Sequence, residues 1–189
     1  MSLEILKQSL INAPIVKKGD YSYVVHPITD GVPEIKPKLL NEVVDEMQKR
    51  IAKCGPFDKI VTVEAMGIPL ASTLSVKMKI PFVIIRKRSY GLPGEISIEQ
   101  TTGYSKSKLY INGLEKGDTI VIVDDVLSTG GTLSAVISTL KKLEVIIKGI
   151  FIVIDKGNVA KQITDKFKVA IDIIANIEVV DDKVVIKKI

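Results

Sequence analysis

Several residue types are scarce in this chain of 189 residues. It has one cysteine, one histidine and no tryptophan, and aromatic residues make up 5% of it. The single cysteine, Cys54, excludes an internal disulfide and a cysteine metal cluster, which favours a reducing compartment. The single histidine, His26, likewise excludes a cluster of histidine metal ligands. We expect His26 in a surface loop, with a contact in the part that covers a ligand as the alternative.

Long apolar stretches are missing as well. No uninterrupted run reaches about 18 apolar residues, so no membrane span is predicted. The first ten residues are amphipathic and lack the apolar segment of a signal peptide. We therefore expect a soluble, cytoplasmic protein that does not bind membranes. The net charge of +5 fits either nucleic acid or a polyanionic small molecule, but the only dense basic cluster in a predicted site is Arg86-Lys87-Arg88.

Hydrophobic residues make up 46% of the chain, and with so few aromatics the core must consist mainly of Ile, Val and Leu. Four β-branched runs are typical of buried parallel strands: KIVTVE, PFVIIR, TIVIVDD and GIFIVID. Strands are predicted at 59–64, 81–86, 104–111, 119–124, 145–154 and 169–174. Helical spacing predicts helices at 37–53, 68–78, 132–143 and 159–167. This alternation predicts one α/β domain with a central, mainly parallel sheet flanked by helices.

Less regular segments surround this core. A short helix is predicted at 3–11 and a hairpin at 16–25 that turns at a Gly-Asp pair. A second hairpin near the C-terminus turns at Asp181-Asp182. Three prolines between residues 27 and 37 mark an irregular connection, and the polar, glycine-containing residues 87–103 are predicted to form a long loop.

In open α/β sheets, ligands bind beyond the carboxyl ends of the strands. One predicted strand ends in Asp124 and Asp125, and the segment from Ser128 to Thr132 then opens a helix. Helix N-terminal amides, glycines and hydroxyl groups form a phosphate site. Two adjacent carboxylates suit the two hydroxyls of a sugar, or a Mg²⁺ ion shared with the ligand. Together these groups predict a ribose 5-phosphate site, and the absence of G-x-x-x-x-G-K-[ST] and of G-x-G-x-x-G after a strand argues against nucleotide P-loops and dinucleotide folds.

The segment from Ile120 to Thr132, IVIVDDVLSTGGT, resembles the 5-phosphoribosyl-1-diphosphate (PRPP) signature of type I phosphoribosyltransferases. Other segments resemble the adenine, xanthine and archaeal hypoxanthine/guanine members: VTVEAMGIPLA the diphosphate loop, PFVIIRKRSYGLPGE the basic strand end and lid, and GYSKSKLYI the returning strand. The resemblance covers about residues 37–180. It implies the type I phosphoribosyltransferase fold as a single domain over 1–189, with a core at about 37–157, a small hood from about 12–36 and 158–189, and a flexible lid loop at about 88–103.

The resemblance also implies site residues. Mg²⁺ is the expected cofactor, held directly or indirectly by Asp124 and Asp125, which would also orient the ribose. Arg86 and Lys87 would stabilise the departing diphosphate, so these four residues are the expected catalytic groups. A strained non-proline cis peptide is expected at Ala65-Met66, and Met66 stands where adenine enzymes usually carry Arg. The expected PRPP-binding residues are Ala65, Met66, Gly67, Arg86, Lys87, Asp124, Asp125, Ser128, Thr129, Gly130, Gly131 and Thr132.

Lys156 follows the strand GIFIVID. In 6-oxopurine transferases a lysine after this strand donates to the exocyclic oxygen of the purine. Because a lysine only donates, we expect transfer from PRPP to hypoxanthine or guanine. Adenine or xanthine is the alternative within the family. A PRPP-sensing regulator that binds nucleic acid is the alternative outside enzymes, although no appended nucleic-acid-binding module is visible. The family further implies a homodimer.

The general base stays open. Many hypoxanthine/guanine enzymes carry Asp where Ser128 stands, and some adenine enzymes carry a lid Glu where Gly103 stands. Glu95 or Glu99 in the lid, which also contains Tyr104, could substitute, or the purine could lose its proton to water. No Ser/His or Cys/His arrangement suggests a covalent nucleophile, so catalysis would be positional and electrostatic.

Overall fold

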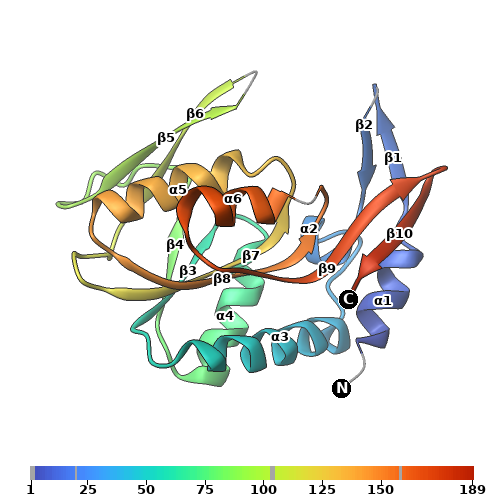
Figure 1. Ribbon diagram of the computed structural model, residues 1–189, viewed down its shortest axis with the longest axis horizontal. Helices are drawn as coiled ribbons and strands as arrows, with labels where there is room; N and C mark the ends of the chain where they lie inside the picture. The colour runs from blue at the N-terminus through green and yellow to red at the C-terminus, as the bar shows by residue number, and fades with distance from the viewer. Residues whose placement is uncertain (1–2, 20, 103–104, 158) are drawn as a thin grey trace.

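The computed structural model describes residues 3–19, 21–102, 105–157 and 159–189 of the chain. Its centre is a six-stranded sheet in the order β10-β9-β8-β7-β3-β4 (Figure 1). All neighbouring pairs in it are parallel except β9 with β10. The mainly parallel sheet expected from the β-branched runs is therefore confirmed. Its strands are β3 (Lys59–Val63), β4 (Phe82–Ile85), β7 (Thr119–Leu127), β8 (Ile146–Asp155), β9 (Ile171–Val180) and β10 (Lys183–Lys188).

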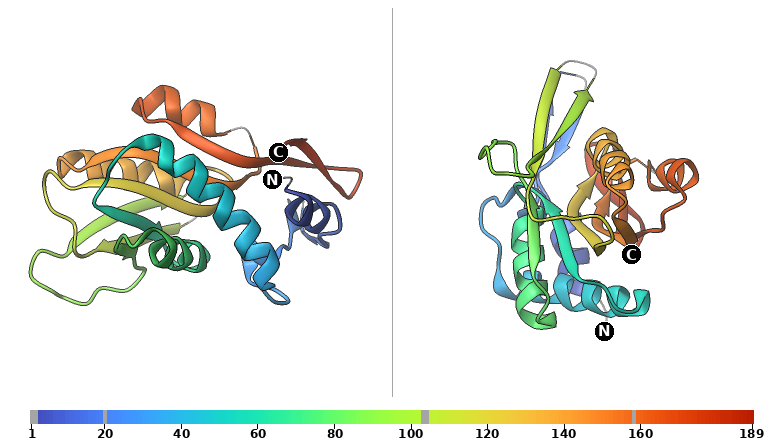
Figure 2. Two further views of the ribbon diagram at one scale, coloured as in Figure 1. Left: turned by 90° about the horizontal axis from the view of Figure 1, so that it is seen from below. Right: turned by 90° about the vertical axis from the view of Figure 1, so that its left-hand side faces the viewer.

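Helices cover both faces of this sheet. One face carries α3 (Pro37–Ile51) and α4 (Gly67–Met78), and the other carries α5 (Gly131–Lys142) and α6 (Val159–Phe167) (Figures 1 and 2). Because apolar residues of α3 recur at helical spacing, one stripe of the helix is buried, formed by Leu39, Val43, Val44, Met47 and Ile51. Burying side chains of this size stabilises the fold by roughly 1.5–3 kcal/mol each. The 3₁₀ turn η1 (Ala52–Cys54) follows and ends at Gly55, with φ 75°.

The N-terminal segment and the last hairpin form the hood on one side of the sheet. The turn between β9 and β10 places Asp181 and Asp182 at φ 49° and 56°, the left-handed geometry that short hairpin turns require. The other hood elements are β1 (Ile15–Lys18), β2 (Tyr21–Val24) and α2 (Pro27–Asp30). The helix α1 (Glu4–Ile11), which lies outside the predicted hood, packs beside them against β10 and α3.

Among the described residues, each helix is too short or too polar to cross a membrane.

The segment predicted as a long loop is partly a strand. Residues Ile96–Thr102 form β5, which pairs antiparallel with β6 (Ser105–Ile111). The prediction was wrong because isoleucines at alternate positions give β5 a buried face, and Ile98 is 1% exposed. The hairpin packs against α5 and projects from the body in Figure 1. Among the described residues of the predicted lid, those from 88 to 95 lack regular structure.

Strand β7 is also longer than predicted. It was expected to end at Asp124, but it continues to Leu127. The reason is the neighbouring strand, since β8 supplies partners that pair Val126 with Ile154 and Leu127 with Asp155. Both acidic residues of the predicted ribose site therefore sit on regular strand backbone rather than in a loop.

Candidate active site

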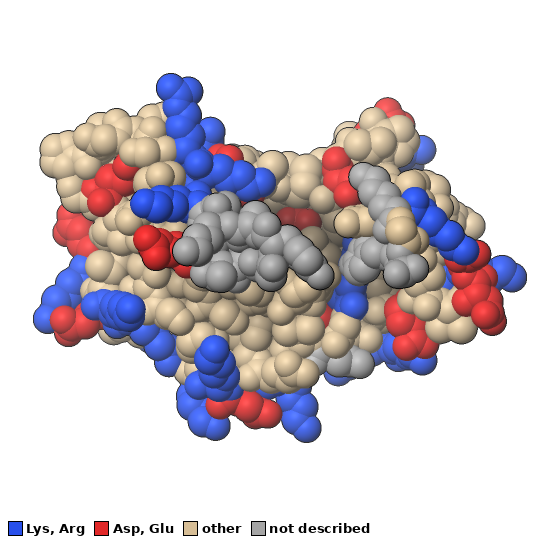
Figure 3. All heavy atoms as spheres, turned by 90° about the horizontal axis from the view of Figure 1, so that it is seen from above, with Lys and Arg blue, Asp and Glu red and all other residues tan. Residues whose placement is uncertain are grey.

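Four connections meet at one edge of the sheet because they follow the carboxyl ends of parallel strands. These are the segments after β3, β4, β7 and β8, as predicted. Figure 3 looks onto this side of the molecule. It shows a hollow between the projecting parts, with acidic side chains at its bottom and Lys and Arg side chains around it.

Asp124 and Asp125 lie at the end of β7. Asp125 is 7% exposed, and its backbone N–H donates to Asp124 Oδ1 at 3.0 Å. Among the residues that the structure describes, no Lys or Arg forms an ion pair with either carboxylate. Burial raises the pKa of both carboxyl groups above their ordinary range, and the repulsion between them raises the pKa of Asp125 further. Such a pair is stabilised by a ligand that brings hydroxyl donors or a cation.

The loop after β7 leads into α5. Gly130 has φ 74° and precedes the first helical residue. A side chain there is excluded, since a Cβ would lie 2.6 Å from Ile163 and 2.8 Å from Val159 of α6. A cavity of about 140 Å³ opens beside the loop, and the first amides of α5 have no acceptor within the helix. The cavity can take a phosphate group; it is lined by Asp124, Val126, Leu127, Ser128, Thr129, Gly130, Gly131, Thr132, Leu133 and Ile152.

The loop after β3 contains Glu64, Ala65 and Met66. A cis peptide was expected at Ala65-Met66, but it joins Glu64 to Ala65. The Ala65 carbonyl accepts a hydrogen bond from Ile68 N at 3.2 Å, at the start of α4. Met66 contacts the hood, since a Cβ at Gly31 would lie 3.3 Å from its terminal carbon.

Arg86 and Lys87 follow β4. The Arg86 backbone forms two hydrogen bonds with Tyr110 of β6, at 2.9 and 2.7 Å. Its Nε lies 2.6 Å from Glu64 Oε2, in a direction that makes no hydrogen bond. The guanidinium carbon lies 5.9 Å from the centre of the Tyr90 ring. Lys87 is exposed, so one of the two expected diphosphate ligands is paired with a carboxylate and the other faces solvent.

Glu95 is surrounded by donors of the lid. It accepts hydrogen bonds from Ser89 Oγ at 2.5 Å, from Tyr90 N at 2.9 Å and from Asn112 Nδ2 at 2.9 Å. These bonds, that from Asn112 first, lower the pKa of Glu95 to about 2. Glu95 is thus ionised and organises the segment after β4.

The other acid considered as a base is farther along the hairpin. Glu99 lies on β5 and lines a hollow with Ser138 and Lys142 in the C-terminal half of α5. The phosphate loop is at the opposite end of that helix. Tyr104, the remaining lid residue predicted, lies outside the described residues.

Lys156 is half-buried beneath the hood. Its backbone N–H donates to the Leu127 carbonyl at 2.8 Å, which ties the end of β8 to the end of β7. Its Nζ donates to the carbonyl of Val24, the last residue of β2, at 3.3 Å. The ammonium group therefore has further donors for a ligand held between the hood and the sheet edge.

The prediction that His26 lies in a surface loop was wrong, because its side chain is 0% exposed. Its Nδ1 accepts from Ile28 N at 3.2 Å and so caps α2. Its Nε2 lies 2.9 Å from Ser9 Oγ, whose proton is directed to the Leu6 carbonyl at 2.8 Å. The ring is therefore neutral with its proton on Nε2, and burial lowers its pKa to about 4. In return, Asp30 accepts from His26 N at 2.9 Å, and this His-x-x-x-Asp spacing was the available sequence signal.

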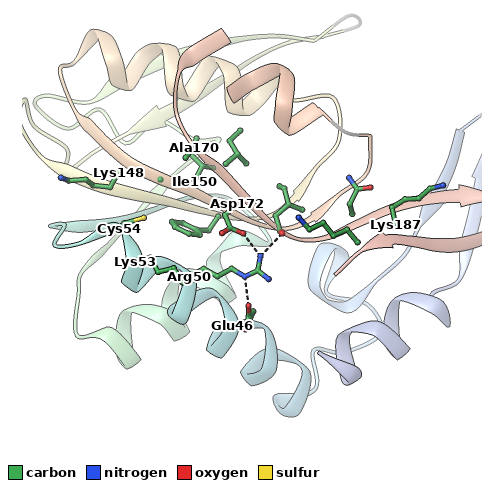
Figure 4. Close-up of a pocket in the computed structure, with 15 residues that line it drawn as sticks. Glu46, Arg50, Lys53, Cys54, Lys148, Ile150, Ala170, Asp172 and Lys187 are labelled. Atoms are coloured by element: carbon green, nitrogen blue, oxygen red, sulfur yellow. Dashed lines mark hydrogen bonds and ion pairs between the residues drawn. The ribbon is translucent and has the colours of Figure 1, made fainter. Parts of the chain in front are cut away.

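A larger hollow of about 870 Å³ lies on the α3 face of the sheet (Figure 4). None of the residues that line it was predicted for the site. Arg50 reaches across it from α3, donating to Glu46 at 2.8 Å and to Asp172 at 2.6 Å. It also donates to the Ile173 carbonyl at 3.0 Å. We call this hollow the Arg50 groove.

Comparisons with known proteins agree with this geometry. The chain matches the phosphoribosyl transferase domain over residues 34–184. It is 53% identical over 185 residues to the hypoxanthine/guanine phosphoribosyltransferase of Methanocaldococcus jannaschii, covering 96% of this chain and 99% of that protein. A protein of the same name from Aciduliprofundum boonei is 50% identical over 182 residues, covering 96% and 98%.

A solved structure shows the same fold. The adenine phosphoribosyltransferase of Thermoanaerobacter pseudethanolicus has a TM-score of 0.75 at 24% identity, over 93% of this chain and 99% of that chain. The expected type I fold is thus confirmed, together with the family suggested by IVIVDDVLSTGGT. The chain belongs to the phosphoribosyltransferase family.

Proposed function

We propose that the protein transfers the phosphoribosyl group of PRPP to hypoxanthine or guanine, giving the nucleotide and diphosphate. One observation carries this proposal: two adjacent carboxylates without a paired cation, one buried and one half-buried, lie beside a glycine-rich helix start, with a lysine beneath the hood one strand away. Two relatives that are 53% and 50% identical to this chain are named hypoxanthine/guanine phosphoribosyltransferase, which supports the proposal. The solved structure of an adenine phosphoribosyltransferase supports the fold and not the choice of base.

Each group has a role in this reaction. The amides of Gly131 and Thr132 would bind the 5′-phosphate, and Asp124 and Asp125 would accept hydrogen bonds from the ribose hydroxyls. Arg86 would leave Glu64 and bind the diphosphate, with Lys87 as the second cation. The purine nitrogen then displaces the diphosphate at the ribose C1. No protein nucleophile is needed, and the fixed charges stabilise the leaving group.

A Mg²⁺ ion fits this site as part of the substrate complex. Asp124 and Asp125 are hard oxygen ligands without a paired cation, as such an ion prefers. Among the described residues no group of three or more acidic, His or Cys ligands forms a complete metal site. Asp124 and Asp125 would therefore hold an ion that PRPP also ligates. When bound, the ion would neutralise charge on the departing diphosphate.

Lys156 supports a 6-oxopurine. The ammonium group has three donors and no acceptor, and one donor is directed to the Val24 carbonyl. The remaining donors suit a carbonyl oxygen at position 6 and leave a 6-amino group without an acceptor.

Because Glu95 is already surrounded by donors, we propose that the purine loses its proton to water.

A panel of four purines tests the proposal. Adenine, guanine, hypoxanthine and xanthine are each incubated with PRPP and MgCl₂, and nucleotide formation is measured. We expect turnover of guanine and hypoxanthine and a value of kcat/KM at least about 100-fold lower for adenine. Exclusive use of adenine would refute the role of Lys156. Salt-dependent RNA binding without turnover of any purine would favour a regulator instead.

We also propose a cytoplasmic homodimer. Apolar residues remain exposed on the hood side, where Ile5 is 42% and Val32 is 53% exposed, and they would suit a protein contact. Light scattering after size-exclusion chromatography measures the mass directly. A mass near 20.7 kDa at working concentration would refute the dimer.

A further inference from the structure

Thr62 on β3 has a buried hydroxyl group without a partner. The residue is 0% exposed, and its Oγ1 makes no hydrogen bond. Within the described part of the chain, Arg86 Nε is the other buried side-chain polar atom in this condition. Both atoms flank the loop between β3 and α4. A buried hydroxyl without a partner costs about 1–3 kcal/mol, so its presence at this place needs an explanation.

The neighbour of this hydroxyl is the first acid of the ribose site. A Cβ placed on Gly67 would lie 2.0 Å from Thr62 Oγ1 and 2.7 Å from Asp124 Oδ1. The two oxygens are therefore packed against the same α-carbon, one from β3 and one from the adjacent strand β7. Gly67 has ordinary backbone geometry, since it is absent from the residues with positive φ. Its lack of a side chain makes room for this pair of oxygens rather than for an unusual turn.

The chemistry of the two groups is complementary. A threonine hydroxyl can donate, and an ionised carboxylate only accepts. Asp124 Oδ1 already accepts from the Asp125 amide at 3.0 Å, and a second donor would fix the plane of the carboxylate. The other oxygen, Oδ2, would then be directed to the ligand. A hydrogen bond to a charged group is stronger than one between neutral groups.

We infer that Thr62 is a positioning residue, which orients Asp124 toward the ribose when PRPP binds. This inference rests on the proposed function, since it assigns a further residue to the same site. Thr62 does not touch the substrate and acts through Asp124. Gly67 is required because any side chain there would separate the two oxygens.

The test exchanges the hydroxyl and the methyl group of Thr62 separately. Thr62→Val keeps the shape and removes the donor, whereas Thr62→Ser keeps the donor and removes the methyl group. PRPP binding is measured by titration calorimetry with and without MgCl₂, purine turnover by steady-state kinetics, and stability by thermal unfolding. Thr119→Val, at the far end of β7, is the matched control, because its hydroxyl bonds to Asp58 away from the site.

The two variants should have opposite effects, one on PRPP binding and the other on thermal stability. Thr62→Val loses roughly 10- to 100-fold in PRPP affinity and in kcat/KM for PRPP, the factor that one hydrogen bond to a charged group supports. Its Tm is unchanged or higher, because an unsatisfied hydroxyl is replaced by a methyl group. Thr62→Ser binds PRPP like the wild type although its Tm falls. On the Asp124→Ala background, which leaves no acceptor for the Thr62 hydroxyl, Thr62→Val has no further effect.

Three results would overturn the inference. Normal PRPP binding by Thr62→Val removes the role, and a fall in Tm that matches the loss of activity makes it structural. A full additional loss on the Asp124→Ala background shows that Thr62 does not act through Asp124. A wild type that binds PRPP but converts no purine would refute the proposed function alone, and binding would still report on Thr62. A wild type that binds no PRPP would refute both.

Discussion

The carboxyl-end site and the Arg50 groove treat charge in opposite ways. In the site, two adjacent carboxylates, one buried and one half-buried, have no paired cation among the described residues, and two buried polar atoms lack hydrogen bonds. In the groove, one arginine joins two carboxylates and a backbone carbonyl (Figure 4). The groove is the larger hollow, about 870 Å³ against about 140 Å³ beside the phosphate loop.

The difference teaches that unsatisfied groups locate the chemistry better than the size of a hollow. A paired arginine holds α3 against β9 and has little left to offer a ligand. Two adjacent carboxylates without a cation weaken the fold. On the proposed function, they gain hydrogen-bond donors or a cation when the substrate binds. Changes in the site should therefore alter activity more than stability, and changes in the groove should do the reverse.

The largest expected effect is that of Asp125→Asn. Turnover should fall at least about 100-fold, since the side chain loses the charge that meets the ribose or the metal. The Tm should stay the same or rise, because a repulsive buried pair has been relieved. Kinetics and thermal unfolding measure both quantities, with Asp172→Asn in the groove as the control. Near-normal turnover of Asp125→Asn would contradict the assigned role.

Acid should loosen the hood before it loosens the groove. The pKa of His26 is about 4 in the fold against an ordinary 6.5, so the unfolded chain binds a proton first as the pH falls. The contribution of neutral His26 to the free energy of unfolding is fully present above pH 6.5. It is lost as the pH falls from 6.5 to about 4, by up to roughly 3 kcal/mol. Hydrogen exchange should show α2 opening before α3.

A matched variant isolates this effect. His26→Asn keeps an acceptor that can cap α2 but cannot be protonated. Its stability should change less across this pH window than that of the wild type. Equal pH slopes for the two proteins would show that His26 is not responsible.

Two glycines allow the same comparison for packing. Gly130→Ala forces a left-handed residue against α6 and should cost on the order of 1–3 kcal/mol. Gly149→Ala in the groove meets Phe151 at 3.0 Å and Cys54 at 3.2 Å, with ordinary φ, and should cost less. Chemical denaturation measures both changes. A larger loss at Gly149 would reverse the order.

The smallest expected effect is that of Arg50→Met. The side chain of Arg50 is 20% exposed, and those of its partners Glu46 and Asp172 are 21% and 44% exposed. Because solvent can reach these partners, stability should fall by only about 1 kcal/mol. Purine turnover should stay within about twofold of the wild type. A large loss of activity would mean that the groove and the site are coupled.

Local patterns were sufficient for the parallel sheet, whereas the extension of β7 to Leu127 required its partner β8. The β-branched runs became buried strands, and α6 begins and ends where helical spacing placed it. What failed depended on pairing and packing with other elements. β5 is a strand because it pairs with β6, the next segment of the chain, and His26 is buried because Ser9 of α1 lies against it.

The contacts within the site also required the fold. No feature of KIVTVE marks Thr62, because its neighbours Gly67 and Asp124 come from other elements. The predicted cis peptide fell one bond away. The assignment of Lys156 to the purine rested on family resemblance and stays a prediction.

The ion pair between Arg86 and Glu64 bears on how a catalytic cycle ends. On the proposed function, Glu64 holds the guanidinium before the diphosphate arrives and would reclaim it as the product departs. The carboxylate would then compete with the diphosphate as an internal anion and weaken the binding of both substrate and product. Without that competitor, as in Glu64→Gln, diphosphate should bind more tightly and leave more slowly, so that product release rather than chemistry limits the rate.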